Sequence, residues 1–263
     1  MNDVVVQVRS LAQQAGAPLA AIAATICALE LLVIRRALSE RGVFAWSVLR
    51  DEWGPMRPLA SLVFSDSGIL VLISLQLASA LALPFTAHAP HLIAAAPAWI
   101  AAATTLLIAV RFRGTYNGGS DSMLLVVLGA HAAIRTWPGT SIAQGAATYV
   151  IVQLALSYFV AGVAKLGDPA WRTGKALAIL VTLPQYRVPP SIAALLSRPS
   201  LGWLATMGML ALECAFPIAL LDPRAALVFA AAGALFHATN AGVFGLNRFW
   251  WAWLAAYPFL LAR

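Results

Sequence analysis

Long apolar runs that carry almost no charge are the feature that most constrains how this chain can fold. Hydrophobic residues make up 61% of its 263 residues and charged residues only 10%, whereas an average soluble domain has about 25% charged residues. Inside a bilayer, only helices and closed barrels satisfy their own backbone hydrogen bonds. Apolar runs of about 17 to 25 residues are the length of membrane-spanning helices. We therefore predict an all-α protein, a polytopic transmembrane helical bundle.

About eight apolar segments are candidates for spanning helices. They follow one another with no soluble domain between them, so residues 1–263 are predicted to form a single integral membrane domain. The first run lacks an A-x-A-like cleavage site followed by a polar chain, and we expect it to be retained. The predicted spans are approximately residues 18–34, 69–85, 92–110, 123–134, 142–165, 201–221, 225–244 and 249–261.

Two amphipathic stretches are predicted to add interfacial helices. Residues 41–67 scatter apolar side chains among charges at helical spacing, which favours a helix lying in the membrane interface, with an ordinary capped loop as the alternative. Residues 171–183 are amphipathic but too short to span, and the polar residues 187–199 follow them. This pattern predicts a re-entrant or interfacial helix. Residues 247–253 are typical of an aromatic belt at a membrane surface.

Charge and cysteine usage exclude several classes of function. The net charge is +7, but the basic residues lie in loops and form no stripe interleaved with aromatic residues, so nucleic acid is not expected as a partner. Cys27 and Cys214 lie inside apolar runs, where a free Cys behaves as a small hydrophobe. His88 and His91 share a short loop without a carboxylate or a Cys. We therefore expect no metal site.

The segment around Lys165 is the main candidate for a site. Gln153, Ser157, Ala161 and Lys165 are successive i+4 neighbours, and Tyr158 lies on the adjoining row, so one helix face is small and polar. We expect this face to point into the bundle. A Gly-Asp-Pro turn and Trp171 then follow. Lys165 fits either a site residue at an inward-facing helix end or a Lys that snorkels to the interface.

Other ionisable residues lie at helix starts or inside spans. Asp121 begins a predicted helix close to Arg111 and Asn117, and these three residues could line a polar pocket, although helix capping alone also explains the carboxylate. Glu213 and His237 lie near the middle of predicted spans. An ionisable residue in a span is costly and is a site hypothesis by default. His131, by contrast, is typical of a hydrogen-bonded core histidine.

Several of these positions together resemble the HTTM domain, the bacterial relative of the membrane part of vitamin K-dependent gamma-carboxylase. The turn at residues 116–121 is similar to that of short bacterial members, including the sporulation-delaying protein B group. The resemblance implies that Lys165 matches the base needed for reduced vitamin K to react with oxygen. The positions that carry it are residues 158–166, Trp171, Gly174, Glu213, Pro217, Phe236 and His237.

The chain also departs from the carboxylase. Ser120 and Asp121 stand where the carboxylase has an Asn-His pair, and the large extramembrane portion that binds the substrate protein is absent. Carboxylation of glutamate is therefore not expected. Most of the 17 Lys and Arg residues fall in loops on one predicted side, which the positive-inside rule places in the cytoplasm. The resemblance instead places the Lys165 end outside, and we follow it.

Two functions follow as hypotheses. In the first, an intramembrane pocket of Lys165, Asp121, Tyr158, Glu213 and His237 performs base-assisted oxidation or modification of a lipid-soluble quinol or of a peptide. The sequence does not define a cofactor, and a quinol or quinone is the candidate. In the second, the protein is a non-enzymatic membrane subunit or maturation factor for a secreted peptide toxin, and Lys165 pairs with Glu213 or Asp121. A transporter is less favoured, because no inverted repeat is visible. The expected location is a bacterial inner membrane.

Overall fold

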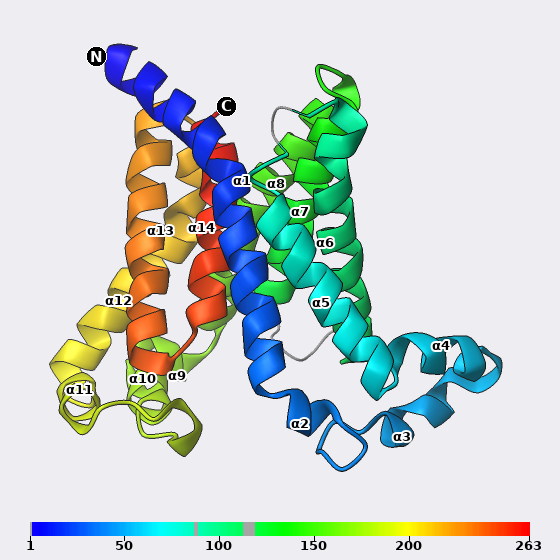
Figure 1. The fold of residues 1–263 in the computed structure, drawn as a ribbon. Helices are drawn as coiled ribbons and strands as arrows, with labels where there is room; N and C mark the ends of the chain where they lie inside the picture. Colours follow the sequence, from blue (N-terminus) through cyan, green and yellow to red (C-terminus); the bar gives the residue numbers. More distant parts are fainter. Residues whose placement is uncertain (1, 87–88, 113–118) are drawn as a thin grey trace. The chain divides into compact units, whose positions relative to one another are not determined.

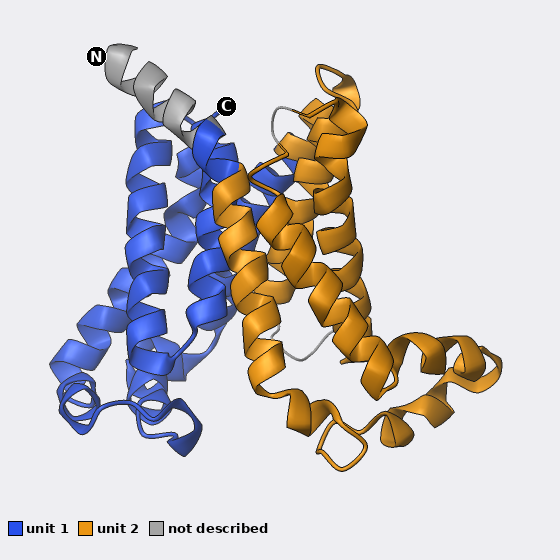
Figure 2. Cartoon of the chain, viewed as in Figure 1, with its two compact units in different colours: residues 1–16, 148–263 blue, residues 17–147 orange. Residues whose placement is uncertain are grey.

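The computed structural model describes residues 2–86, 89–112 and 119–263, with side chains described from Gln14 onward. These residues form helices and turns, and no β-strand occurs among them (Figure 1). The predicted all-α class is thus confirmed. Two residues named above, His88 and Asn117, lie outside the described residues. The chain divides into two compact units, which are described in turn (Figure 2). Unit 1 comprises Met1–Gly16 and Thr148–Arg263, and unit 2 comprises Ala17–Ala147.

Within the described residues, five helices are long and apolar enough to cross a membrane, or six if one bent pair counts as a single span. The predicted number of eight is therefore too high. The helix α7 (Gly119–Thr136) has polar residues at both ends, and α14 (Asn247–Leu261) has only 15 residues, fewer than the roughly 17 that a span needs. The five are Gln14–Val33 within α1 (Asn2–Val33), α6 (His91–Arg111), α8 (Ser141–Gly167), Pro199–Leu220 and α13 (Pro223–Phe244).

Unit 2 is built around the neighbouring helices α5 (Asp66–Ala82), α6 and α7. The buried side of α6 is rich in alanine, which lets helix backbones approach closely; it includes Ala94, Ala95, Ala98, Ala101 and Ala102. Arg135 of α7 donates from Nη1 to the carbonyl oxygens of Leu83 at 3.1 Å and Ala94 at 2.9 Å. The carbonyl of Leu83, at the C-terminal end of α5, has no partner within its helix, so Arg135 caps α5 and ties it to the first turn of α6.

The stretch before α5 is helical, so the alternative of a capped loop is wrong. It contains α2 (Arg35–Leu38), α3 (Trp46–Leu49), η1 (Arg50–Met56) and α4 (Arg57–Phe64). Trp46, Trp53 and Phe64 form an aromatic cluster with ring centroids 5.3 to 6.2 Å apart. Val48 and Leu62, in contrast, are 72% and 75% exposed. The segment Trp46–Phe64 bends by 57° from α5. Its location in a membrane interface stays a prediction.

Unit 1 contains most of α8 and the helices that follow it. Five of them begin with proline, whose fixed φ and missing N–H suit the first position of a helix. The helices after α8 are α9 (Pro169–Arg172), α10 (Lys175–Leu180), η2 (Pro184–Tyr186), α11 (Pro190–Leu196), α12 (Pro199–Ala215), η3 (Phe216–Leu220), α13 and α14. The stretch 187–199, expected to be a polar connection, therefore holds the short helix α11.

The residues that follow α8 satisfy its terminal carbonyls and cap the next helix, α9. Asp168 accepts the N–H of Ala170 on Oδ1 at 2.8 Å, which caps α9. Arg172 donates from Nη1 to the Leu166 carbonyl at 2.6 Å, which satisfies a terminal carbonyl of α8. The Gly-Asp-Pro sequence thus ends one helix and begins another. Lys165 consequently lies in the last turn of α8.

The helices α8 and α12 approach closely at Gly162. A Cβ atom placed on Gly162 would lie 2.8 Å from Cys214 Sγ and 2.9 Å from Glu213 Cβ, closer than real Cβ contacts. Only glycine therefore allows this separation of the two backbones. Lys165 follows Gly162 by three residues, so it lies near the same contact.

Candidate functional site

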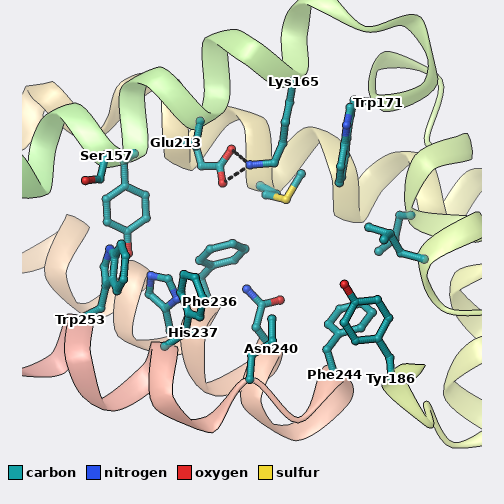
Figure 3. Close-up of a pocket in the computed structure, with 17 residues that line it drawn as sticks. Ser157, Lys165, Trp171, Tyr186, Glu213, Phe236, His237, Asn240, Phe244 and Trp253 are labelled. Atoms are coloured by element: carbon teal, nitrogen blue, oxygen red, sulfur yellow. Dashed lines mark hydrogen bonds and ion pairs between the residues drawn. The ribbon is translucent and has the colours of Figure 1, made fainter. Parts of the chain in front are cut away.

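Lys165 on α8 and Glu213 on α12 form a bidentate ion pair (Figure 3). The Lys165 Nζ atom donates to Oε1 at 2.7 Å and to Oε2 at 2.8 Å. Glu213 is only 3% exposed, and the Lys165 side chain is 23% exposed. The ammonium also lies over the ring of Trp171, 5.6 Å from its centroid, which is a cation–π distance. The sequence offered Glu213 and Asp121 as partners of Lys165, and the structure pairs Lys165 with Glu213.

This pairing changes which atoms could accept a proton. Burial favours the neutral form of a Lys, whereas an adjacent carboxylate favours the ammonium. An ammonium has donors only, while an ionised carboxylate has only acceptors. In the charged pair, the proton-accepting atoms are therefore the oxygens of Glu213. The Lys165 ammonium is available to stabilise a negative charge that develops on a bound molecule.

A cavity of about 290 Å³ opens beside the pair, and all of its lining residues belong to unit 1. Its walls are mostly aromatic and apolar, as is usual in small-molecule sites. Figure 3 shows Lys165 and Glu213 on one side of this space, with His237 and Asn240 on the other. The aromatic lining residues are Tyr158, Trp171, Tyr186, Phe236, Phe244, Phe249 and Trp253. Such walls suit a flat ring system better than a charged chain.

His237 on α13 is buried among aromatic rings. It is 5% exposed, with ring centroids of Phe236 and Trp253 each 5.0 Å away and that of Tyr158 5.7 Å away. Neither of its ring nitrogens has a hydrogen-bond partner in the part of the chain that the structure describes. Buried polar groups normally have partners. Both nitrogens are also buried, with less than 1 Å² of accessible surface each, so they face packed side chains and not the open cavity.

Tyr158 presents its ring to the cavity, while its hydroxyl group is bound elsewhere. Its Oη atom lies 2.6 Å from Oη of Tyr257 on α14, and its ring stacks on Phe216 with centroids 4.0 Å apart. A Cβ atom on Gly233 would lie 2.7 Å from the Tyr158 hydroxyl oxygen, so glycine leaves room for this pair. Tyr158 is thus fixed as a rigid wall of the site.

Six of the residues predicted for the site line this one cavity: Ser157, Tyr158, Lys165, Trp171, Glu213 and His237. The polar face predicted for α8 is therefore the face that borders the cavity. Ser157 donates from Oγ to the Gln153 carbonyl at 2.7 Å, and Gln153 Nε2 donates to Oγ of Ser157 at 3.2 Å. These hydrogen bonds within α8 hold the Ser157 side chain in place at the cavity wall.

Arg111 and Asp121 belong to unit 2. Arg111 is 2% exposed and donates to the carbonyls of Phe44 and Phe64. Its guanidinium also lies over the ring of Trp46, 5.3 Å from the centroid. These contacts hold the helical stretch before α5 in place. Asp121 is 8% exposed and lies in the first turn of α7. A role for either residue in substrate binding stays a prediction.

Sequence reasoning missed several residues of the cavity wall. Asn240 follows His237 by three residues and therefore shares its helix face, a spacing that could have identified it. Trp253 was assigned to an aromatic belt at the membrane surface, but it is 7% exposed and packs against His237 and Phe249. Tyr186 lies in η2, and no periodic pattern in the sequence distinguishes it.

Comparison with protein families defines the class of the protein. Residues 133–263 match the HTTM domain, and this range includes every residue that lines the cavity. The chain therefore belongs to the HTTM family through its C-terminal half and, with its long apolar helices, is an integral membrane protein. No curated protein and no solved structure shows significant similarity to it.

Proposed function

We propose that this HTTM-family protein is a membrane enzyme that uses the pocket around Lys165 for base-assisted oxidation or modification of a lipid-soluble quinol or of a peptide. The observation that carries the proposal is the buried Lys165–Glu213 pair in the wall of an aromatic cavity. Ionisable residues in a membrane span are costly and usually functional. A pair that borders an open cavity can act on a bound molecule.

In this scheme Glu213 accepts a proton from a hydroxyl or amide group of the substrate. The Lys165 ammonium then stabilises the resulting anion, and its cation–π contact with Trp171 keeps it in place. The aromatic walls keep water away from the reactive anion. His237 and Asn240 lie on the opposite wall of the cavity. This mechanism differs from one in which the lysine alone is the base, because Lys165 is already bound to a carboxylate.

Purification in native lipids followed by mass spectrometry tests the proposal. We expect one quinone per chain in the wild type and quinol-dependent oxygen uptake that is lost in Lys165→Ala, provided that the variant inserts normally into the membrane. Lys175→Ala is the matched control, because Lys175 is exposed at the start of α10 and does not line the cavity. Unchanged turnover in Lys165→Ala would remove Lys165 from the mechanism.

The second candidate is a membrane subunit or maturation factor for a secreted peptide, and the completeness of the Lys165–Glu213 pair favours it. Polar contacts between helices can serve only to join them. Here Lys165→Met is expected to cost about 3 to 5 kcal/mol, since it leaves a buried carboxylate alone. The double variant Lys165→Met/Glu213→Leu should recover this stability. A double variant that is stable and retains a co-purified protein supports the subunit; one that is stable but has lost quinol turnover supports the enzyme.

A further inference from the structure

We infer that a second pocket, between the end of α1 and the start of α5, binds the phosphate group of an anionic phospholipid through Arg35 and Arg36. The pocket has a volume of about 230 Å³, and both arginines line it together with Asp66. All of its lining residues belong to unit 2. The inference therefore does not depend on the function proposed for the cavity beside Lys165.

The pocket lies where the chain is expected to leave the hydrocarbon of the membrane. The part of α1 that can span a bilayer ends at Val33, and α2 begins at Arg35. On the other side of the pocket, α5 begins at Asp66, and Asp66 Oδ2 accepts the backbone N–H of Glu40 at 3.2 Å. This hydrogen bond joins the segment after α1 to the first turn of α5. Because lipid head groups border the hydrocarbon core at the ends of spanning helices, a lipid phosphate can reach this pocket.

The two arginines keep most of their hydrogen-bond donors available. Arg35 Nη1 donates to the Leu32 carbonyl at 3.3 Å, and the Arg36 side chain has no hydrogen-bond or ion-pair partner among the described residues. Asp66 lines the same pocket but forms an ion pair with neither arginine. Each guanidinium has five N–H donors in a planar fork that fits two oxygens of a phosphate. The pocket therefore has two positive charges against one negative charge, and a ligand with a single negative charge balances it.

Apolar side chains around the pocket indicate that the phosphate belongs to a lipid. Leu70 lines the pocket and is 39% exposed. Val33 near the end of α1 and Val71 beside Leu70 on α5 are 81% and 56% exposed. Basic pockets between membrane helices are typical sites for anionic lipid head groups. The pocket is small for a whole ligand, so it holds the head group while the acyl chains stay in the bilayer against these apolar side chains.

Phosphatidylglycerol and phosphatidylcholine with the same acyl chains are a matched pair of probes, because both contain a phosphate and only the first has a net negative charge. Native mass spectrometry of the full chain in detergent measures the affinity of each lipid. We expect phosphatidylglycerol to bind about tenfold more tightly than phosphatidylcholine. Arg35→Gln and Arg36→Gln should each weaken its binding by about fivefold. Arg57→Gln is the control and should leave binding unchanged, because Arg57 is exposed in the same segment and lies outside the pocket.

Asp66→Asn tests the charge balance with an effect of the opposite sign. The asparagine side-chain oxygen can still accept the N–H of Glu40, whereas the negative charge beside the arginines is lost. Binding of phosphatidylglycerol should therefore become about fivefold tighter. Damage to the fold would weaken binding instead, so thermal unfolding is measured on each variant. Unchanged binding by a folded Asp66→Asn variant would overturn the charge balance on which the inference rests.

Two further results would overturn the inference. If the two lipids bind equally, or if Arg57→Gln loses as much affinity as Arg36→Gln, binding reflects the general surface charge and not this pocket. Competition separates a lipid from a soluble ligand with the same phosphate chemistry. Millimolar inorganic phosphate should leave phosphatidylglycerol bound to the wild type. Displacement of the lipid would instead identify a soluble phosphate as the occupant.

Discussion

Gly162 sets how close Lys165 comes to Glu213. The glycine allows α8 and α12 to touch, because a Cβ atom added at this position would lie only 2.9 Å from the backbone nitrogen of Cys214. Any side chain here would push α12 away within a turn of the ion pair. The Lys165 side chain is long and could follow, but its contact with Trp171 would then be lost. A residue without a functional group thus controls the geometry of the site.

Gly162→Ala is expected to lower the free energy of unfolding by about 1 to 3 kcal/mol, because backbone atoms of a packed interface must move. Thermal unfolding in detergent measures the change. Gly208→Ala on α12 is the matched control, since nothing lies within 4 Å of its Cβ position, and alanine there should gain up to about 1 kcal/mol from helix propensity. Equal stability of Gly162→Ala and the wild type would show that the two helices are not tightly packed.

Residue patterns could identify most of the site but could not pair its members. The i+4 ridge on α8 predicted the face that borders the cavity, and charge within a span identified Glu213 and His237. The choice between Glu213 and Asp121 as the partner of Lys165 depended on a helix contact between residues 48 positions apart. No local period in a sequence contains that information. The wall residue Tyr186 was missed for the same reason.

At the scale of elements, the amphipathic segment Trp46–Phe64 places its aromatic side chains and its other apolar side chains in different environments. Its aromatic residues turn inward around Trp46, whose Nε1 donates to Ser61 Oγ at 3.0 Å. Arg57 and Asp51 pair at 3.2 Å on the surface, while Leu59 and Leu62 are 58% and 75% exposed. Charges would be costly in hydrocarbon and exposed leucines costly in water. A membrane interface accommodates both.

A fluorophore attached to Leu62→Cys is expected to be quenched more strongly by bromines near the lipid head groups than by bromines near the bilayer centre. Leu75→Cys on α5 is the control and should show the reverse, because it lies within a predicted span and is also exposed. Both variants need a background with Cys27→Ala and Cys214→Ala. Stronger quenching of the Leu62→Cys fluorophore from the bilayer centre would instead make the bent pair one broken span.

Helix type was predictable, whereas the number of spans was not. Apolar content and length predicted α6, α8, α13 and the span Pro199–Leu220, which combines α12 and η3, close to their observed bounds. The helices α7 and α14 were counted as spans on apolar content alone. Several of the aromatic residues of α14 face protein rather than lipid: Trp253 and Tyr257 are 7% and 4% exposed. Apolar composition does not distinguish these two environments.

The orientation of the whole molecule is defined by the side of the membrane that the Lys165 end faces. The family resemblance predicts the outside, and the distribution of Lys and Arg predicts the cytoplasm. Ser197→Cys reports on this end, because Ser197 is exposed in the segment between α11 and α12. In a cysteine-free background, we expect a membrane-impermeant maleimide to label it in intact bacterial cells. Labelling only after lysis would favour the charge distribution.

The family match and the structure divide the molecule at similar places. The HTTM match begins at residue 133 and the C-terminal part of unit 1 begins at Thr148. The cavity and the Lys165–Glu213 pair both fall inside the shared region. The matched part is the half of the chain that carries the site. The role of unit 2 and the single-domain organisation stay predictions.

The ion pair also constrains how this sequence can evolve. Loss of Lys165 alone leaves a carboxylate at 3% exposure without its counter-ion, and loss of Glu213 alone leaves the ammonium without its bidentate partner. Each first step is harmful, so a lineage that abandons the pair must change both positions almost together. Whether a substitution at one of these two positions is tolerated therefore depends on the residue at the other. A descendant with apolar residues at both positions would keep the fold and lack the ion pair on which the proposed activity rests.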